Sequence, residues 1–176
     1  MYKLGDKVTI IGAGNAAMDV ARTVIRNGSR KVTCFSVTKE VAASDYEFSY
    51  AKLEGVKFQY NLKPIEIKDD GVLFKEVIED ENGNITETEG SEKFYPSDSV
   101  IIAISQGPCN TIVSTTTGLK ADDRGLLIAD ETGKTSREGI FASGDAVAGA
   151  RTVVEAVSRS KVVAENMHKY MQGLAD

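Results

Sequence analysis

Small residues with the spacing of a phosphate-binding turn stand near the N-terminus. Residues 12–17 read Gly-Ala-Gly-Asn-Ala-Ala, which is the pattern G-x-G-x-x-A. In such a turn Gly12 makes the bend, Gly14 lets the backbone approach a pyrophosphate, and Ala17 lets a helix pack closely on a strand. The start of the helix adds free N–H groups and a positive dipole end. The alternative is an ordinary strand-to-helix turn.

The flanking residues decide between these two interpretations. Residues 7–11 form a short β-branched run that predicts a strand. From Asn15 the apolar residues have helical spacing, and Gly28 is placed to end the helix. Residues 31–36 predict a second strand. Strand, turn, helix and strand make one βαβ unit, which is the context that favours dinucleotide binding.

The residues after the second predicted strand bear on which nucleotide binds. An NAD site usually places an acidic residue there for the ribose hydroxyls, whereas an NADP site uses an arginine. Here the strand ends in Ser36-Val37-Thr38-Lys39-Glu40. Glu40 comes late for a ribose contact, and Lys39 is able to meet a 2′-phosphate. The alternative is that both are solvated loop charges, so NADPH and NADH both stay open.

The rest of the chain predicts an α/β fold with a β-ribbon. Ser44 and Glu47 have capping-box spacing and predict a helix that runs to Leu53. Residues 71–95 predict the ribbon, because alternating segments flank a turn at 80–84. The unbroken apolar run 99–105 is typical of a strand at the centre of a sheet. The other predicted strands are residues 56–60, 64–68, 126–130 and 139–143. Residues 110–124 predict a loop or linker, and residues 152–171 predict a last amphipathic helix.

Bulk composition excludes several classes of protein. The 176 residues carry a net charge of −5 and show no basic cluster, which argues against nucleic-acid binding. The apolar runs are too short to span a membrane, and no signal peptide is visible. The two cysteines, Cys34 and Cys109, lie far apart, so a reduced cytoplasmic chain is the simplest interpretation.

Several segments, in the same order, resemble the small (β) subunit of glutamate synthase. The related flavin modules of dihydropyrimidine dehydrogenase and of NADH-dependent ferredoxin–NADP oxidoreductases share them. The segments that carry the resemblance are residues 12–22, 32–34, 54–58, 64–67, 100–110 and 135–145. In that family an NAD(P)H domain is inserted into an FAD domain. Hydride passes from NAD(P)H to the flavin, and electrons leave through iron–sulfur clusters or a partner subunit.

The resemblance implies two domains and a set of binding residues. Residues 1–108 would form a Rossmann-like three-layer NAD(P)H-binding domain, and residues 109–176 the C-terminal segment of an FAD-binding domain. The residues expected to contact the nicotinamide dinucleotide are Gly12, Gly14, Asn15, Ala16 and Ala17. Gln106 is also expected to contact a cofactor, and the residues expected on the FAD side are Gly144, Asp145, Thr152 and Val153.

The FAD-side residues have distinct expected roles. Asp145 would accept a hydrogen bond from a ribitol hydroxyl, although Gly144-Asp145 alone also fits a strand-ending turn. Thr152 and Val153 would direct N–H groups at the flavin pyrimidine from a helix N-terminus. No side chain is an obvious acid or base, and hydride transfer between cofactors depends on positioning.

The chain departs from the family pattern in two places. The relatives carry Tyr-Arg-Arg where this chain has Ser36-Val37-Thr38, so an NADP preference is in doubt. The family's N-terminal FAD-binding βαβ unit and its cysteine-rich cluster segment, expected before Met1, are absent. We therefore expect the chain alone to bind FAD weakly or not at all. The expected partners are that FAD-binding half, a large glutamate synthase subunit and a second copy of the chain, since uncovered apolar area favours self-association.

Other candidate side chains predict structural roles. His168 is the one histidine and has no ligand cluster around it, so we expect no metal site. Cys34 predicts a core thiol and Cys109 an exposed one without a neighbouring base. Asp19 and Arg22 are spaced to pair along one helix. The alternative function is a nucleotide-binding or assembly module without turnover of its own.

Overall fold

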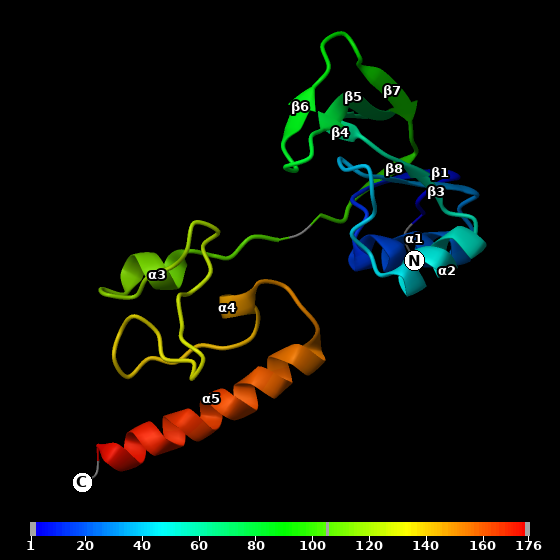
Figure 1. Cartoon of the computed structure of the whole chain (residues 1–176). Helices are drawn as coiled ribbons and strands as arrows, with labels where there is room; N and C mark the ends of the chain where they lie inside the picture. The colour runs from blue at the N-terminus through cyan, green and yellow to red at the C-terminus, as the bar shows by residue number, and fades with distance from the viewer. Residues whose placement is uncertain (1–2, 105, 175–176) are drawn as a thin grey trace. The chain divides into compact units, whose positions relative to one another are not determined.

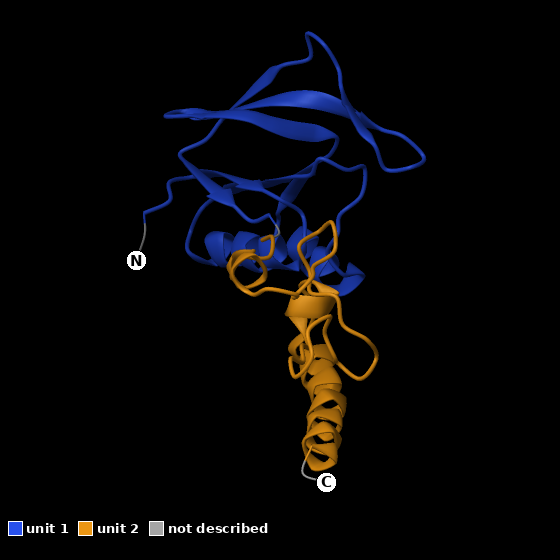
Figure 2. Cartoon of the chain, turned by 90° about the vertical axis from the view of Figure 1, so that its left-hand side faces the viewer, with its two compact units in different colours: residues 1–104 blue, residues 105–176 orange. Residues whose placement is uncertain are grey.

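The computed structural model describes residues 3–104 and 106–174. The chain forms two compact units, residues 1–104 and 105–176 (Figure 2). The predicted βαβ segment and β-ribbon fall wholly in the first unit. The second unit contains the last helix and the loops that precede it.

A parallel sheet forms the middle of the first unit. Its strands are β1 (Lys7–Ile11), β2 (Lys31–Phe35), β3 (Lys57–Gln59) and β8 (Ser99–Ile102), in the order β3-β2-β1-β8. Helix α1 (Asn15–Arg26) connects β1 to β2, and α2 (Asp45–Leu53) connects β2 to β3 (Figure 1). The predicted α/β fold with a βαβ unit is confirmed.

Both helices pack on one face of this sheet through small and branched side chains. Val8 and Ile10 of β1 and Cys34 of β2 belong to the same buried cluster as α1. Ala17 of α1 and Ala51 of α2 are fully buried. Because these residues have no bulk beyond Cβ, the helices can approach the strands closely.

The β-ribbon covers the other face of the sheet. Its strands are β4 (Leu62–Lys68), β5 (Gly71–Glu79), β6 (Ile85–Glu87) and β7 (Lys93–Pro96), and β5 pairs antiparallel with each of the others. Phe35 of β2 stacks on Phe74 of β5 with ring centroids 4.2 Å apart, and Tyr95 meets both rings edge-on. Helices, sheet and ribbon thus make three layers (Figure 1).

Two predictions for the first unit are wrong. Strand β8 lies at the edge of the sheet, beside β1 alone, and Ile102 is 60% exposed. An apolar run indicates that both faces of a strand are covered, but it does not indicate how many strands pair with it. Ser105, the last residue of the predicted strand, lies outside the described residues. Arg22 pairs with Glu47 and Glu54 of α2, at 2.8 and 2.9 Å, instead of with Asp19. The arginine therefore joins two helices.

Residues 106–174 of the second unit contain three helices joined by turns. They are α3 (Thr111–Thr115), α4 (Asp145–Ala148) and α5 (Val153–Gly173). The strands predicted at 126–130 and 139–143 are wrong, because the described residues there form only isolated bridges. Asp122 and Asp130 each accept backbone N–H groups from residues two and four positions later. These carboxylate-held turns lie on either side of the predicted strand 126–130.

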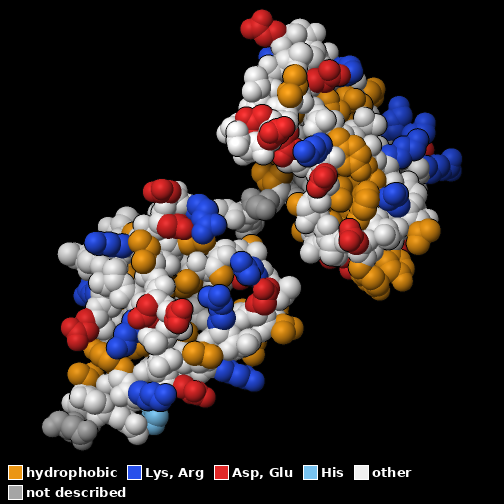
Figure 3. Space-filling model, in the orientation of Figure 1, with side chains coloured by type: hydrophobic (Ala, Val, Ile, Leu, Met, Phe, Trp, Pro, Cys, Tyr) orange, Lys and Arg blue, Asp and Glu red, His pale blue; other side chains and the backbone are white. Residues whose placement is uncertain are grey.

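Helix α5 has no buried side chain among the described residues. Val153, Val154 and Leu174 are each more than two-thirds exposed. Hydrophobic side chains accordingly reach the surface of both units (Figure 3). One side of the helix packs on residues 133–144 through the half-buried Ala156, Val163 and Tyr170. The apolar face expected from the sequence, which includes Val153, Val157, Met167 and Met171, is exposed.

Candidate nucleotide-binding site

Gly12 sits where the backbone has no room for a side chain. Its φ is 127°, and a Cβ atom there would lie 2.3 Å from the carbonyl oxygen of Ala103. Its N–H donates to the carbonyl of Phe35 at 2.9 Å. Gly12 therefore fixes the bend between β1 and α1 at the point where β2 and β8 also end.

Gly14 differs from Gly12 because its surroundings are open. It is the N-cap of α1, with φ −87° and ψ 179°, a conformation that other residues also adopt. A Cβ atom would meet nothing within 4 Å. Among the described residues no side chain caps α1, and its first turn contains no acid. The first N–H groups and the positive dipole end are thus available to an anion.

The residues that follow Gly14 differ in burial and in hydrogen bonding. Ala17 is fully buried against the sheet, whereas Ala16 is exposed at the open helix end. The side-chain Oδ1 of Asn15 accepts the N–H of Ser44 at 2.8 Å. Ser44 in turn caps α2 by accepting the N–H of Glu47. The sequence pattern did not reveal the contact between Asn15 and Ser44, because its partners are 29 residues apart.

The loop after β2 is closed by its own hydroxyl groups. The Oγ of Ser36 and the Oγ1 of Thr38 are 2.9 Å apart, and Thr38 donates to the carbonyl of Glu40 at 2.7 Å. The backbone N–H of Lys39 donates to the Oε2 of Glu79 at 3.1 Å. The side chains of Lys39 and Glu40 are exposed. The turn at Gly12–Ala17 and this loop follow adjacent parallel strands, the place where α/β sheets bind ligands.

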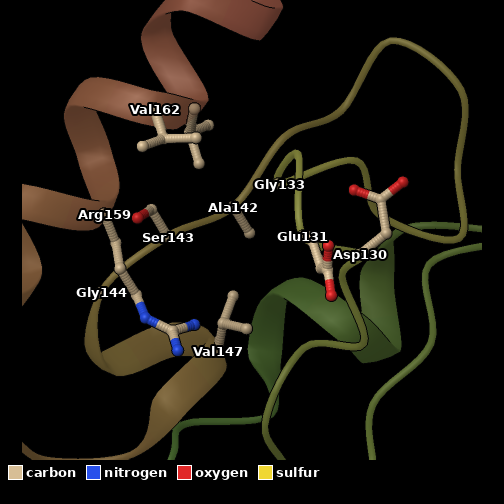
Figure 4. A pocket seen from close by; sticks show the side chains of 10 residues that line it. Asp130, Glu131, Gly133, Ala142, Ser143, Gly144, Val147, Arg159 and Val162 are labelled. Carbon is tan, nitrogen blue, oxygen red and sulfur yellow. The ribbon is translucent and has the colours of Figure 1, made fainter.

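The FAD-side candidates lie in the second unit. Gly144 has φ 64° and caps α4, and Asp145 is exposed beside it. A pocket of 260 Å³ is lined by Ser143, Gly144, Val147 and Arg159, among others. Residues of α5 face the segment 142–144 across it (Figure 4). Asp145 does not line this pocket, and Gln106 is exposed.

The start of α5 carries a capping box. The Oγ1 of Thr152 accepts the N–H of Glu155, and the carboxylate of Glu155 accepts the N–H of Thr152 at 3.1 Å. The N–H of Thr152 is therefore engaged within the chain. At Val153, the first residue of α5, the N–H has no helical partner, as at any helix start.

The two cysteines differ in burial and in pKa. Cys34 is confirmed as a core thiol, and burial raises its pKa to about 12. Cys109 is exposed, and hydrogen bonds from the side chain and backbone of Thr111 lower its pKa. Within residues 3–104 and 106–174, no three His, Cys, Asp or Glu side chains are grouped to hold a metal ion. None of the helices in this range is both long and apolar enough to cross a membrane.

Comparison with known proteins gives one family and several relatives. The family described as pyridine nucleotide-disulphide oxidoreductase matches residues 2–160. The glutamate synthase [NADPH] small chain of Halomonas elongata is 35% identical over 95% of this chain, and that of Escherichia coli is 31% identical over 96%. The β subunit of the NADP(+)-dependent formate dehydrogenase of Moorella thermoacetica is 33% identical over 96%. The chain spans 39% of the length of each glutamate synthase relative and 25% of the dehydrogenase subunit.

Solved structures show the same fold. The thioredoxin reductase of T. acidophilum superposes with a TM-score of 0.79 at 23% identity, over 94% of this chain and 52% of its own. That of Lactococcus lactis gives 0.73 at 24% identity, over 95% and 53%. These likenesses establish the arrangement of the elements around the glycine turn.

Proposed function

The chain belongs to the pyridine nucleotide-disulphide oxidoreductase family, and we propose that it is the NAD(P)H-binding part of a flavoprotein oxidoreductase. In the complete protein this part would hold NAD(P)H, which would supply hydride to FAD, and the electrons would then leave to iron–sulfur or partner acceptors. The observation that carries this proposal is the open N-terminus of α1 at Gly14. The names of the glutamate synthase relatives support the same kind of electron transfer, which would serve glutamate biosynthesis.

The first unit has the groups needed to hold a pyrophosphate. Gly12 turns the chain, and Gly14 leaves a space that the phosphates would occupy. The N–H groups of Asn15, Ala16 and Ala17 would donate to phosphate oxygens, helped by the helix dipole. A bound nicotinamide supplies the hydride, and the chain contributes position and exclusion of water.

The second unit supplies only some of the groups that FAD needs. The exposed carboxylate of Asp145 and the N–H of Val153 fit the roles of a ribitol acceptor and a flavin donor. Gln106, Gly144 and Thr152 would complete this side, although the N–H of Thr152 is already bonded to Glu155. We propose that an FAD-binding half of the complete protein provides the remaining contacts. The greater length of the relatives, of which this chain spans 39%, is compatible with such a half.

The exposed apolar face of α5 is the surface on which we expect a partner to bind. An exposed apolar face of this kind is typical of a surface that another polypeptide covers. The proposed partners are the FAD-binding half, a large glutamate synthase subunit and a second copy of the chain. The same observation supports a second candidate function, an assembly module that binds nucleotide without turnover. The two free thiols fit a reducing compartment such as the cytoplasm.

A calorimetric titration tests the proposal. The purified chain is titrated with NADPH and with NADH, each with and without added FAD. We expect one or both nucleotides to bind without FAD, because the glycine turn is complete within the first unit. If neither nucleotide binds under any of the four conditions, the proposed nucleotide site is wrong. Binding without any reduction of added FAD, even with the FAD-binding half present, would favour the assembly module.

A further inference from the structure

A carboxylate from the ribbon holds the loop that would meet the adenosine end of the nucleotide. Glu79 is the last residue of β5, and its Oε2 accepts the backbone N–H of Lys39 at 3.1 Å. The contact joins residues 40 positions apart in the sequence. A negative charge is therefore fixed beside Lys39, the one cation among residues 36–40.

The other polar groups of the loop are already engaged with one another. The N–H of Thr38 donates to the Oγ of Ser36 at 3.2 Å, and the Oγ1 of Thr38 donates to the carbonyl of Glu40. These donors would have to break their bonds to contact a 2′-phosphate. Glu79 together with residues 36–40 carries two carboxylates, those of Glu79 and Glu40, and one ammonium group, so the formal charge of this part of the molecule is negative.

The loop and the ribbon are also fixed to each other. Backbone N–H groups of Leu62 and Asn61 donate to the carbonyls of Ser36 and Thr38, at 3.0 and 3.4 Å. Below them Phe35 stacks on Phe74. Glu79 consequently stays near the loop unless several contacts break together.

We propose that Glu79 is a specificity-determining residue that makes this site prefer NADH to NADPH. Its carboxylate repels the 2′-phosphate, which carries close to two negative charges, and tolerates the neutral 2′-hydroxyl of NADH. The inference rests on the proposed nucleotide site and adds which nucleotide that site takes. The ribbon, in addition to the end of β2, thereby selects between NADH and NADPH.

The test compares Kd values for NADH and NADPH in the parent chain, in Glu79→Gln and in Glu89→Gln. Glutamine keeps an oxygen for the N–H of Lys39 and removes only the charge. Glu89→Gln makes the same charge change at an exposed position of the ribbon outside the strands. We expect Glu79→Gln to tighten NADPH binding by about fivefold, the upper size measured for one solvent-exposed charge pair, with NADH within about twofold. Glu89→Gln should alter neither.

A salt series on the parent chain gives an independent readout that needs no variant. If Glu79 repels the 2′-phosphate, the affinity for NADPH relative to NADH rises with salt, because salt screens the repulsion. If Lys39 instead attracts the phosphate, this ratio falls, and the inference is wrong. Equal effects of the two glutamine variants, or a parent that prefers NADPH, also overturn it. A parent that binds neither nucleotide refutes the proposed function itself.

Discussion

The side-chain oxygen of Asn15 accepts the backbone N–H of Ser44 at 2.8 Å, and so ties the first residue of α1 to the N-cap of α2. Ala13 adds a second link, since its carbonyl accepts the N–H of Ala43 at 3.0 Å. The glycine turn is therefore braced by the segment before α2. Asn15 has a structural role beside its predicted contact with a nucleotide.

Two substitutions at Asn15 separate these roles. Asn15→Ala removes the acceptor and should lower the free energy of unfolding by about 1 kcal/mol, because the N–H of Ser44 loses its partner. Asn15→Asp keeps an acceptor and should preserve stability, while its charge weakens binding of a pyrophosphate. Urea unfolding and nucleotide titration of both variants check this. Full affinity in the Asp variant would show that Asn15 lies away from the phosphates.

The two glycines of the turn should respond differently to substitution. Gly14→Val should abolish nucleotide binding and change the free energy of unfolding by no more than about 1 kcal/mol, because a side chain there enters open space. Gly12→Ala should destabilise the first unit by about 3 kcal/mol or more, because its Cβ meets the carbonyl of Ala103. Circular dichroism melts and calorimetry distinguish the two. A Gly14→Val chain with parental affinity would place the pyrophosphate elsewhere.

The two thiols should react at very different rates. A disulfide reagent at pH 8 should modify Cys109 rapidly, since it is exposed and its pKa is lowered, and should reach Cys34 only in denaturant. The Cys109→Ser variant should then show no rapid phase. Two fast thiols in the native chain would contradict the burial of Cys34.

Cys34 should also make stability depend on alkaline pH. Its pKa rises from 9.0 to about 12 on folding, so its contribution is complete below pH 9 and is lost as pH rises toward 12. Cys34→Ala should flatten the decline of unfolding free energy over that range, which urea titrations at several pH values measure. An unchanged slope in the variant would assign the decline to other groups.

The ion pairs of Glu54 with its two arginines should make the stability of the chain depend on pH in the acid range. Hydrogen bonds from Arg26 and Arg22 lower its pKa below 4.5, so its contribution is present above pH 4.5 and is lost as pH falls through the lowered value. Glu54→Gln should reduce Tm by a few degrees at pH 7, and the difference should shrink in acid. Glu81→Gln, at an exposed position of the hairpin turn, is the control and should leave Tm unchanged. A constant difference down to pH 3 would argue against the ion pairs.

The purified chain should carry no stoichiometric flavin. By the proposed function the second unit supplies only part of an FAD site, and α5 has no buried side chain among the described residues. The absorbance of the purified sample near 450 nm checks this directly. Addition of the FAD-binding half should restore flavin retention, whereas a yellow sample of the chain alone would mean that the site is complete.

Local patterns predicted the elements that position the glycine turn. The β-branched run of β1, the apolar stripe of α1 and the capping spacing at Ser44 each depend on neighbours within a few residues. Gly12 and Gly14 share the same motif, yet the structure separates one that is sterically required from one that faces open space. The motif alone does not contain that difference, because Ala103 comes from a distant strand.

Contacts between distant segments were beyond prediction from one sequence. The edge position of β8 depends on which strands pair with it, and the partner of Glu79 depends on how the ribbon folds over the sheet. The turns at Asp122 and Asp130 lie on either side of the predicted strand 126–130, and their side-chain oxygens bind backbone N–H groups there.

Because β1 and β2 are packed on both faces, backbone amides of the first unit should exchange with deuterium on two different time scales. Their amide protons lie between the helical layer and the ribbon, so we expect them to exchange with deuterium only when the whole unit unfolds. The exposed hairpin turn after Glu79 should exchange through local opening. Such an opening would leave Glu79 beside the loop after β2, because the bonds from Asn61 and Leu62 to that loop hold the ribbon in place. Both ends of the proposed site therefore keep their geometry while the hairpin turn opens and closes.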